Sequence, residues 1–317
     1  MISNYHVVHE TVYDYGEPVP ICQNELRMRP RSSAMLNCKA CEISISPKPE
    51  TLLSYVDYFG NEVDSFAIES PHRQLKVRVA SDIGVYSRDD TELGSGPRWR
   101  DVADAIAAGG DGEDWTAAEF VHASRRIGLD DQYVSFARDI FADEADLIIA
   151  TEALTKRIHQ TFAYDPTATG VDTSTEDAFE IRAGVCQDFS HVQIACLRSI
   201  GIPARYVSGY LRTIPPPGKP RLVGADQSHA WISVYAGREL GWIDYDPTNA
   251  CRTASDHIPV CLGRDYDDIS PMRGIVIGGG DTVLKVSVDV IPDEPAGGQS
   301  QISQQMDGMS NGLPSGD

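Results

Sequence analysis

The chain has 317 residues, 41% of them hydrophobic, so it is long enough for two domains and apolar enough to fold around cores. Acidic residues outnumber Lys and Arg by 47 to 27, which gives a net charge of −20. Such a surface repels phosphate backbones and anionic lipid, so we expect no nucleic-acid partner and no membrane partner. The acidity is typical of a soluble protein, with a preference for basic protein or peptide substrates as the alternative.

The sequence also bears on the cell compartment. No stretch reaches the roughly 18–20 apolar residues that cross a bilayer. The first residues, MISNYHVVHETVYDYG, lack the basic and apolar regions of a signal peptide, so we expect a cytoplasmic protein with reduced thiols. The odd number of cysteines, seven, also argues against a disulfide framework. One CxxC motif, Cys38 to Cys41, has no second ligand pair nearby for zinc and precedes a strand pattern, so we interpret both thiols as structural.

The first 95 residues predict a β-sandwich-like module. Apolar and polar side chains alternate there with the period of two that is typical of strands, and no long helical pattern intervenes. Gly16 and Gly60 lie in turn sequences between these stretches. The predicted strands are residues 5–15, 42–46, 52–58, 62–68 and 75–79.

Residues 96–292 predict a second domain of helices and strands, so the expected fold class is α+β. Helices are predicted at 99–108, 114–127, 133–142, 144–162 and 186–200, with Asp114 as the N-cap of the second. Strands are predicted at 205–211, 230–235, 241–245 and 282–291. Residues 293–317 are rich in Gly, Ser and Gln, and we expect a disordered tail.

Cys186 is the candidate nucleophile. It lies at the predicted start of a helix, where free backbone N–H groups and the helix dipole favour a thiolate. Gly184 just before it permits a tight turn and leaves room for a substrate. An isolated free Cys is more often a buried structural residue, so the assignment depends on its partners.

His229 and Asp246 are the candidate base and orienting group. His229 enters one predicted strand and Asp246 leaves the next, so a hairpin would bring them within hydrogen-bonding distance. The N-terminus of the helix that carries Cys186 would pack against them. Asp244, two residues earlier on the same strand, is an alternative orienting group.

Two other polar residues near the nucleophile have structural interpretations. His191 follows five residues later and would point elsewhere on the helix, so we expect a structural role. Asp188 is expected to stabilise the first helical turn rather than to act as an acid.

Three motifs carry a family resemblance: GVCQDFSHV with LRSIGIPARYVSGYL, then SHAW, then GWIDYDPTN. In this order they resemble the bacterial transglutaminase-like superfamily, whose catalytic triad then corresponds to Cys186, His229 and Asp246. The likeness covers roughly residues 162–249 and implies a papain-like α+β core. The first domain also resembles the β-rich module that precedes this core in many bacterial members, in the stretches HETVYDYGEPV, NELRMRPR and DYFGNEV.

The resemblance implies acyl transfer through a thioester, on a protein or peptide substrate and without a cofactor or metal. We favour amide or peptide hydrolysis, because bacterial members of this kind are often regarded as cysteine protease candidates. The alternatives are a protein-glutamine γ-glutamyltransferase and a non-catalytic protein-binding module. The candidate oxyanion donors are the backbone N–H of Cys186 and, from a positional likeness to the family, Tyr164. No EF-hand-type loop supports a calcium requirement.

Overall fold

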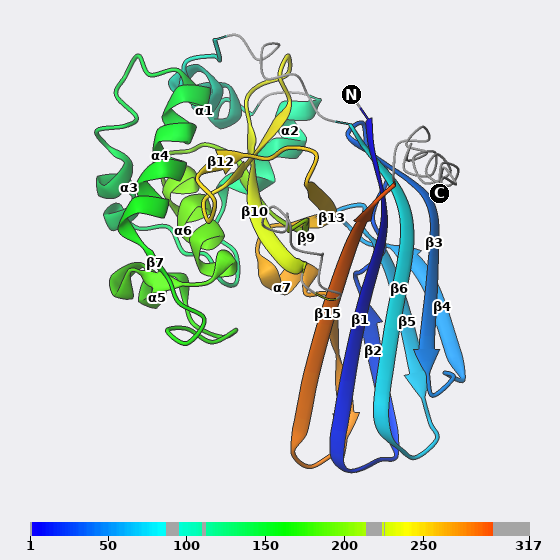
Figure 1. Ribbon diagram of the computed structural model, residues 1–317. Coiled ribbons are helices and arrows are strands. Elements are labelled where there is room, and N and C mark those ends of the chain that lie inside the picture. The colour runs from blue at the N-terminus through cyan, green and yellow to red at the C-terminus, as the bar shows by residue number, and fades with distance from the viewer. Residues whose placement is uncertain (1, 87–94, 110–111, 214–223, 225, 294–317) are drawn as a thin grey trace, which may run out of the picture.

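A computed structural model describes residues 2–86, 95–109, 112–213, 224 and 226–293. A β-sandwich-like module and a module of helices and strands lie side by side, which confirms the predicted α+β class (Figure 1). The predicted disordered tail lies outside the described residues except for Asp293.

The sandwich consists of two antiparallel four-stranded sheets. The first has the order β15 (Thr282–Pro292), β1 (Ile2–Val19), β6 (His72–Tyr86) and β3 (Leu36–Ser46). The second has the order β14 (Met272–Ile277), β2 (Ile21–Leu26), β5 (Glu62–Ile68) and β4 (Thr51–Val56). The alternating sequence buries one face of each strand, and Val19, Leu26, Phe66 and Val77 are among the residues of the core between the sheets.

The last two strands belong to these sheets and not to the sheet of the second module. β15 pairs with β1 from Tyr5 opposite Pro292 to Tyr15 opposite Thr282, and β14 pairs with β2. The predicted domain limits had assigned residues 272–292 to the second domain. β1 and β2 offer sheet edges, and late strands pair with these edges across the length of the chain.

The second module surrounds a five-stranded antiparallel sheet of order β12-β11-β10-β9-β13. Its strands are β9 (Ala204–Leu211), β10 (Gln227–Tyr235), β11 (Trp242–Asp246), β12 (Cys251–Arg252) and β13 (His257–Gly263). The helices are α1 (Trp99–Ala107), α2 (Glu113–Ala117), the 3₁₀ helix η2 (Ala118–Val121), α3 (Asp131–Ala137), α4 (Leu147–Thr161), α5 (Thr175–Ile181), α6 (Cys186–Ser199) and α7 (Tyr266–Ile269). Within the described ranges, no helix is long and apolar enough to span a membrane.

The predicted helix 114–127 is much shorter in the structure, and Asp114 is not its N-cap. Gly112 occupies that position, and the helical backbone ends at Val121. The Asp114 carboxylate accepts hydrogen bonds from Tyr235 Oη at 2.7 Å and Arg238 Nε at 2.6 Å instead. A tertiary contact thus outcompetes the local capping bond that the sequence pattern favours.

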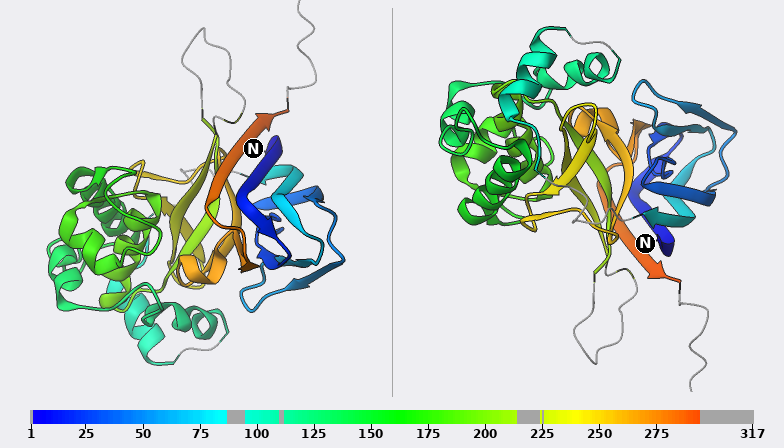
Figure 2. Two further views of the ribbon diagram at one scale, coloured as in Figure 1. Left: turned by 90° about the horizontal axis from the view of Figure 1, so that it is seen from below. Right: turned by 90° about the horizontal axis from the view of Figure 1, so that it is seen from above.

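The five-stranded sheet lies between the helices and the sandwich (Figure 2). α6 packs against β9 and β10, and the two modules share one buried core that includes Tyr5 and Ile83 of the sandwich. Asn61, fully buried in the turn between β4 and β5, bonds both the backbone carbonyl and the N–H of Leu262, at 2.8 and 2.9 Å. These contacts hold the sandwich against one face of the sheet.

Candidate active site

Cys186 is the first residue of α6, as the sequence predicts. The turn before it is held by Asp188, whose Oδ2 accepts hydrogen bonds from the backbone N–H of Val185 at 2.8 Å and from Thr169 Oγ1 at 2.7 Å. The predicted role of Asp188 in the first helical turn is therefore confirmed. The half-buried thiol lies at the positive end of the dipole of a 14-residue helix.

Gly184 makes this turn possible. Its φ is +154°, and a Cβ at this position would lie 2.3 Å from Asp188 Oδ2. Any side chain would therefore push away the carboxylate that holds the backbone of Val185. The glycine that precedes the nucleophile is required by the close approach of Asp188.

His229 and Asp246 meet across the β10–β11 hairpin. The strand register pairs Ile232 with Tyr245, which places Asp246 opposite Trp231. His229 lies two residues from Trp231 on the same strand, so it is diagonal to Asp246. His229 Nε2 donates to Asp246 Oδ2 at 2.7 Å, and both side chains are buried. This pairing leaves Nδ1 of the imidazole for the Cys186 thiol.

Two neighbouring side chains determine the pKa of His229. Burial lowers the pKa of the imidazole, but hydrogen bonds and charge interactions with Asp246 and Cys186 outweigh burial and raise the pKa to about 10. The thiol therefore lies close enough to interact with His229. The raised pKa favours the imidazolium form of His229 beside the Asp246 carboxylate.

Asp246 has more partners than the sequence predicted. Its Oδ1 accepts the backbone N–H groups of Thr248 and Asn249, and its Oδ2 also accepts Asn249 Nδ2 at 2.7 Å and His257 Nε2 at 3.0 Å. Burial raises the pKa of this carboxyl, but the bonds from His229 and His257 outweigh burial and hold it well below its usual range. The side chain is fully buried, so its charge is stabilised by these donors and not by solvent.

His257 is the partner that sequence reasoning missed. It begins β13, and its Nδ1 accepts the backbone N–H of Ala254 at 3.3 Å, so Nε2 carries the proton that it donates to Asp246. No local motif marks this residue. Only the packing of β13 against β9 brings it to the site.

The alternative residues have other partners. Asp244 Oδ2 accepts the indole N–H of Trp231 at 3.1 Å, so the carboxylate that bonds His229 is that of Asp246. His191 is fully buried on α6 and accepts the backbone N–H of Tyr266, and burial lowers its pKa to about 3. This environment agrees with the structural role expected for His191.

Tyr164 lies beside the nucleophile. The short strands β7 (Ala163–Tyr164) and β8 (Ala183–Gly184) are parallel and pair Tyr164 with Gly184. Burial and then the charge of Cys186 raise the pKa of this phenol, whose side chain is half exposed. The position is compatible with donation to an oxyanion formed at Cys186, and that role stays a prediction.

The other cysteines lie in different environments. Burial raises the pKa of Cys196 to about 12 and that of Cys251 to about 11, so both favour the protonated thiol at neutral pH. Burial also raises the pKa of Cys38 and of Cys41, the half-buried thiols of the CxxC motif on β3.

A metal ion would find three ligand atoms at this site. The donor atoms of His229, Asp246 and His257 lie within 4.8 Å of one another. Both imidazoles already donate a proton to the same carboxylate oxygen, so an ion would have to displace both hydrogen bonds. The observed hydrogen bonds account for the three residues without an ion.

Comparison with known proteins gives both family and fold. Residues 5–83 match the bacterial transglutaminase-like N-terminal region, and residues 134–247 match the transglutaminase-like superfamily. An uncharacterised protein of Mycobacterium tuberculosis is 36% identical over 294 residues, which cover 92% of this chain and 93% of that protein. A protein-glutamine gamma-glutamyltransferase of Pseudomonas aeruginosa is 40% identical over 93 residues, 28% of this chain and 14% of its own length. The crystal structure of a cysteine protease candidate from Cytophaga hutchinsonii has the same fold, with a TM-score of 0.72 at 19% identity over 93% of this chain and 92% of that chain.

Proposed function

Because this chain belongs to the transglutaminase-like superfamily, which includes cysteine-based acyl-transfer enzymes, we propose that it hydrolyses amide or peptide bonds through Cys186, His229 and Asp246. The observation that carries the proposal is the 2.7 Å hydrogen bond from His229 Nε2 to Asp246 Oδ2, in an imidazole that also interacts with the Cys186 thiol. It gives a nucleophile, a base and an orienting carboxylate in the order that acyl transfer requires.

In the proposed first step, the Cys186 thiolate attacks the carbonyl carbon of the substrate amide. The negative charge that develops on the carbonyl oxygen is stabilised by the backbone N–H of Cys186 and by the hydroxyl of Tyr164. His229 then gives its Nδ1 proton to the nitrogen of the leaving amine as the C–N bond breaks. A thioester on Cys186 remains, and His229 is left as a base.

In the second step, His229 removes a proton from water, and the hydroxide attacks the thioester carbonyl. The C–S bond breaks, the carboxylic acid leaves, and Cys186 returns to the thiolate with His229 protonated. Asp246 and its other donors keep the imidazole in one orientation through both steps. We favour water as acceptor because water needs no second binding site of its own.

The second candidate is a protein-glutamine γ-glutamyltransferase, in which a lysine amine replaces water in the second step. The 40% identity to the Pseudomonas enzyme over 93 residues favours this alternative. Those residues are a small part of that enzyme, and the triad serves either acceptor. The choice therefore depends on what reaches the thioester.

One experiment separates the two functions. The full chain is incubated with a glutamine-containing peptide, with and without cadaverine as a primary amine, and the products are identified by mass spectrometry. Peptide cleavage or ammonia release that is lost in Cys186→Ala but retained in Cys251→Ala supports hydrolysis. Cys186-dependent incorporation of cadaverine in place of hydrolysis would identify a transferase, and the absence of both products would contradict the catalytic proposal.

A further inference from the structure

A pocket of about 330 Å³ lies between the two modules and is separate from the nucleophile. Its walls come from β9, β10, β11 and β13 on one side and from the segment after β2 of the sandwich on the other. Neither Cys186 nor His229 lines it, so the proposed peptide site does not account for it. The volume is that of a small-molecule site rather than of a packing defect.

The wall of the pocket contains an arginine, Arg205, whose buried Nε has no hydrogen-bond partner among the described residues. The guanidinium instead lies 4.0 Å from the centre of the Trp242 ring. Burial lowers the pKa of Arg205 to about 10, an effect that Asp244 opposes and the charge of Arg31 reinforces. A buried cation in this position gains from an anion that enters the pocket.

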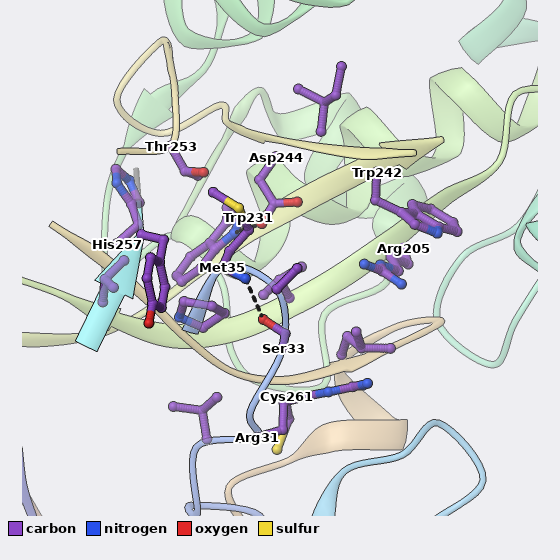
Figure 3. Close-up of a pocket in the computed structure, with 18 of the residues that line it drawn as sticks. Arg31, Ser33, Met35, Arg205, Trp231, Trp242, Asp244, Thr253, His257 and Cys261 are labelled. Atoms are coloured by element: carbon purple, nitrogen blue, oxygen red, sulfur yellow. Dashed lines mark hydrogen bonds between the residues drawn. The ribbon is translucent and has the colours of Figure 1, made fainter. Parts of the chain in front are cut away.

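The rest of the lining suits the body of an organic ligand. Figure 3 shows Arg205 beside Trp242, with Arg31 and Ser33 on the loop from the sandwich. Trp231 and Trp242 offer indole rings, and further apolar contacts come from Met35, Val260 and Leu262. Arg31 adds a second positive charge, and its Nη1 also bonds the Phe59 carbonyl at 2.8 Å. Asp244 is the acidic residue of the lining, and Arg31 and Arg205 together outweigh its charge. This excess of positive charge and the two indoles fit a carboxylate that is joined to an aromatic or aliphatic group.

One residue of the lining also reaches the active site. His257 lines the pocket and donates from Nε2 to the carboxylate of Asp246. A ligand that contacts the His257 ring can therefore change the hydrogen bond from His257 to Asp246, the group that orients His229.

We propose that this pocket binds a small organic carboxylate through Arg205 and Arg31, and that its occupancy changes the reactivity of Cys186 through His257 and Asp246. This proposal has a binding half, which is the carboxylate in the pocket, and a coupling half, which is the change in the reactivity of Cys186. The binding half does not depend on the proposed hydrolysis. The coupling half needs only the reactivity of the thiol, so failure of the enzyme activity would leave both halves testable.

The binding half is tested by calorimetric titration of the full chain with phenylacetate and with phenylacetamide, its uncharged analogue. We expect binding of phenylacetate and at least tenfold weaker binding of the amide. Arg205→Met, which keeps a side chain over Trp242, should weaken phenylacetate binding at least tenfold. Arg273→Met removes an exposed arginine of β14 and should leave binding unchanged.

Several outcomes would overturn this half: no heat at millimolar phenylacetate, equal binding of the amide, or full affinity in Arg205→Met. If Arg205→Met fails to fold, Arg31→Gln on the sandwich loop takes its place with the same expectation. The coupling half is tested by the rate at which iodoacetamide alkylates Cys186. Saturating phenylacetate should change this rate severalfold in the parent chain and leave it unchanged in His257→Phe, which has no donor for Asp246. An unchanged parent rate overturns the coupling.

Discussion

Replacing Asp246 with asparagine removes one charge and keeps the shape of the side chain. The amide oxygen can still accept the backbone N–H groups of Thr248 and Asn249, which lie 2.9 and 3.1 Å from Oδ1. The amide nitrogen cannot accept the three hydrogen bonds that Oδ2 now accepts. These come from His229 at 2.7 Å, His257 at 3.0 Å and Asn249 at 2.7 Å. Each hydrogen bond to a charged group contributes about 1.5–3 kcal/mol. Because the site can partly relax, we expect the free energy of unfolding to fall by about 3–5 kcal/mol, as when one partner of a buried ion pair is removed.

Catalysis should suffer more than stability. Without the carboxylate, His229 loses both its orienting bond and the charge that raises its pKa, so the imidazolium form is no longer favoured. We expect Cys186-dependent turnover to fall by about 10³–10⁴-fold, as for the corresponding change in other triads. Urea unfolding followed by tryptophan fluorescence measures the stability, and product release from the glutamine peptide measures the turnover.

Asp244→Asn is the matched control for this substitution. Asp244 lies two residues earlier on β11 and accepts the indole N–H of Trp231, a bond that an amide oxygen can keep. We expect its turnover to stay within severalfold of the parent chain. If Asp244→Asn were as damaging as Asp246→Asn, or if Asp246→Asn retained full turnover, the assignment of the orienting carboxylate would be refuted.

Three further predictions follow from the same contacts. His257→Phe should reduce turnover about tenfold, because one hydrogen bond to Asp246 is lost, and steady-state kinetics across pH should show an altered profile. Gly184→Ala should lower the melting temperature and the alkylation rate of Cys186, because its Cβ would collide with Asp188 Oδ2 at 2.3 Å. The raised pKa of His229, about 10 against 6.5 when unfolded, contributes stability below pH 6.5 that is lost as pH rises to about 10. Urea titrations at pH 6.5 and 10 should therefore show this loss in the parent chain and less of it in His229→Gln.

Controls distinguish these effects from general damage. Gly170→Ala places a Cβ where no atom lies within 4 Å, so it should leave the melting temperature and the alkylation rate unchanged. Equal melting temperatures for Gly184→Ala and Gly170→Ala would contradict the role of the close approach. A pH dependence that His229→Gln does not reduce would show that another group causes the loss of stability.

The helical part of the site could be predicted from sequence because its causes are local. Cys186 begins α6, and Gly184 and Asp188 shape the turn before it, all within five residues of one another. Helix starts and close backbone approaches depend on neighbouring residues, so their signals are present in a short stretch of sequence. The hairpin of β10 and β11, which brings His229 to Asp246, is also formed by neighbouring strands.

The local signals failed where a distant partner competed for the same group. Asp114 has the sequence context of an N-cap, but its carboxylate bonds Tyr235 and Arg238 in the folded chain. The late strand β15 was predicted by its alternation, while its pairing with β1 was not. Alternation predicts that a strand exists and which face is buried, but it carries no information on which edge the strand joins.

The α+β class, the start of α6 at Cys186 and the three family motifs can be read from the residues alone. Other features are visible only in the folded chain. Asp246 rather than Asp244 bonds His229, His257 is a further partner of Asp246, and Arg205 lines a pocket between the modules. The physical reason is the range of the interactions. Backbone periodicity and caps act over a few residues, whereas the partners of a buried charge are chosen when segments far apart in the chain pack together.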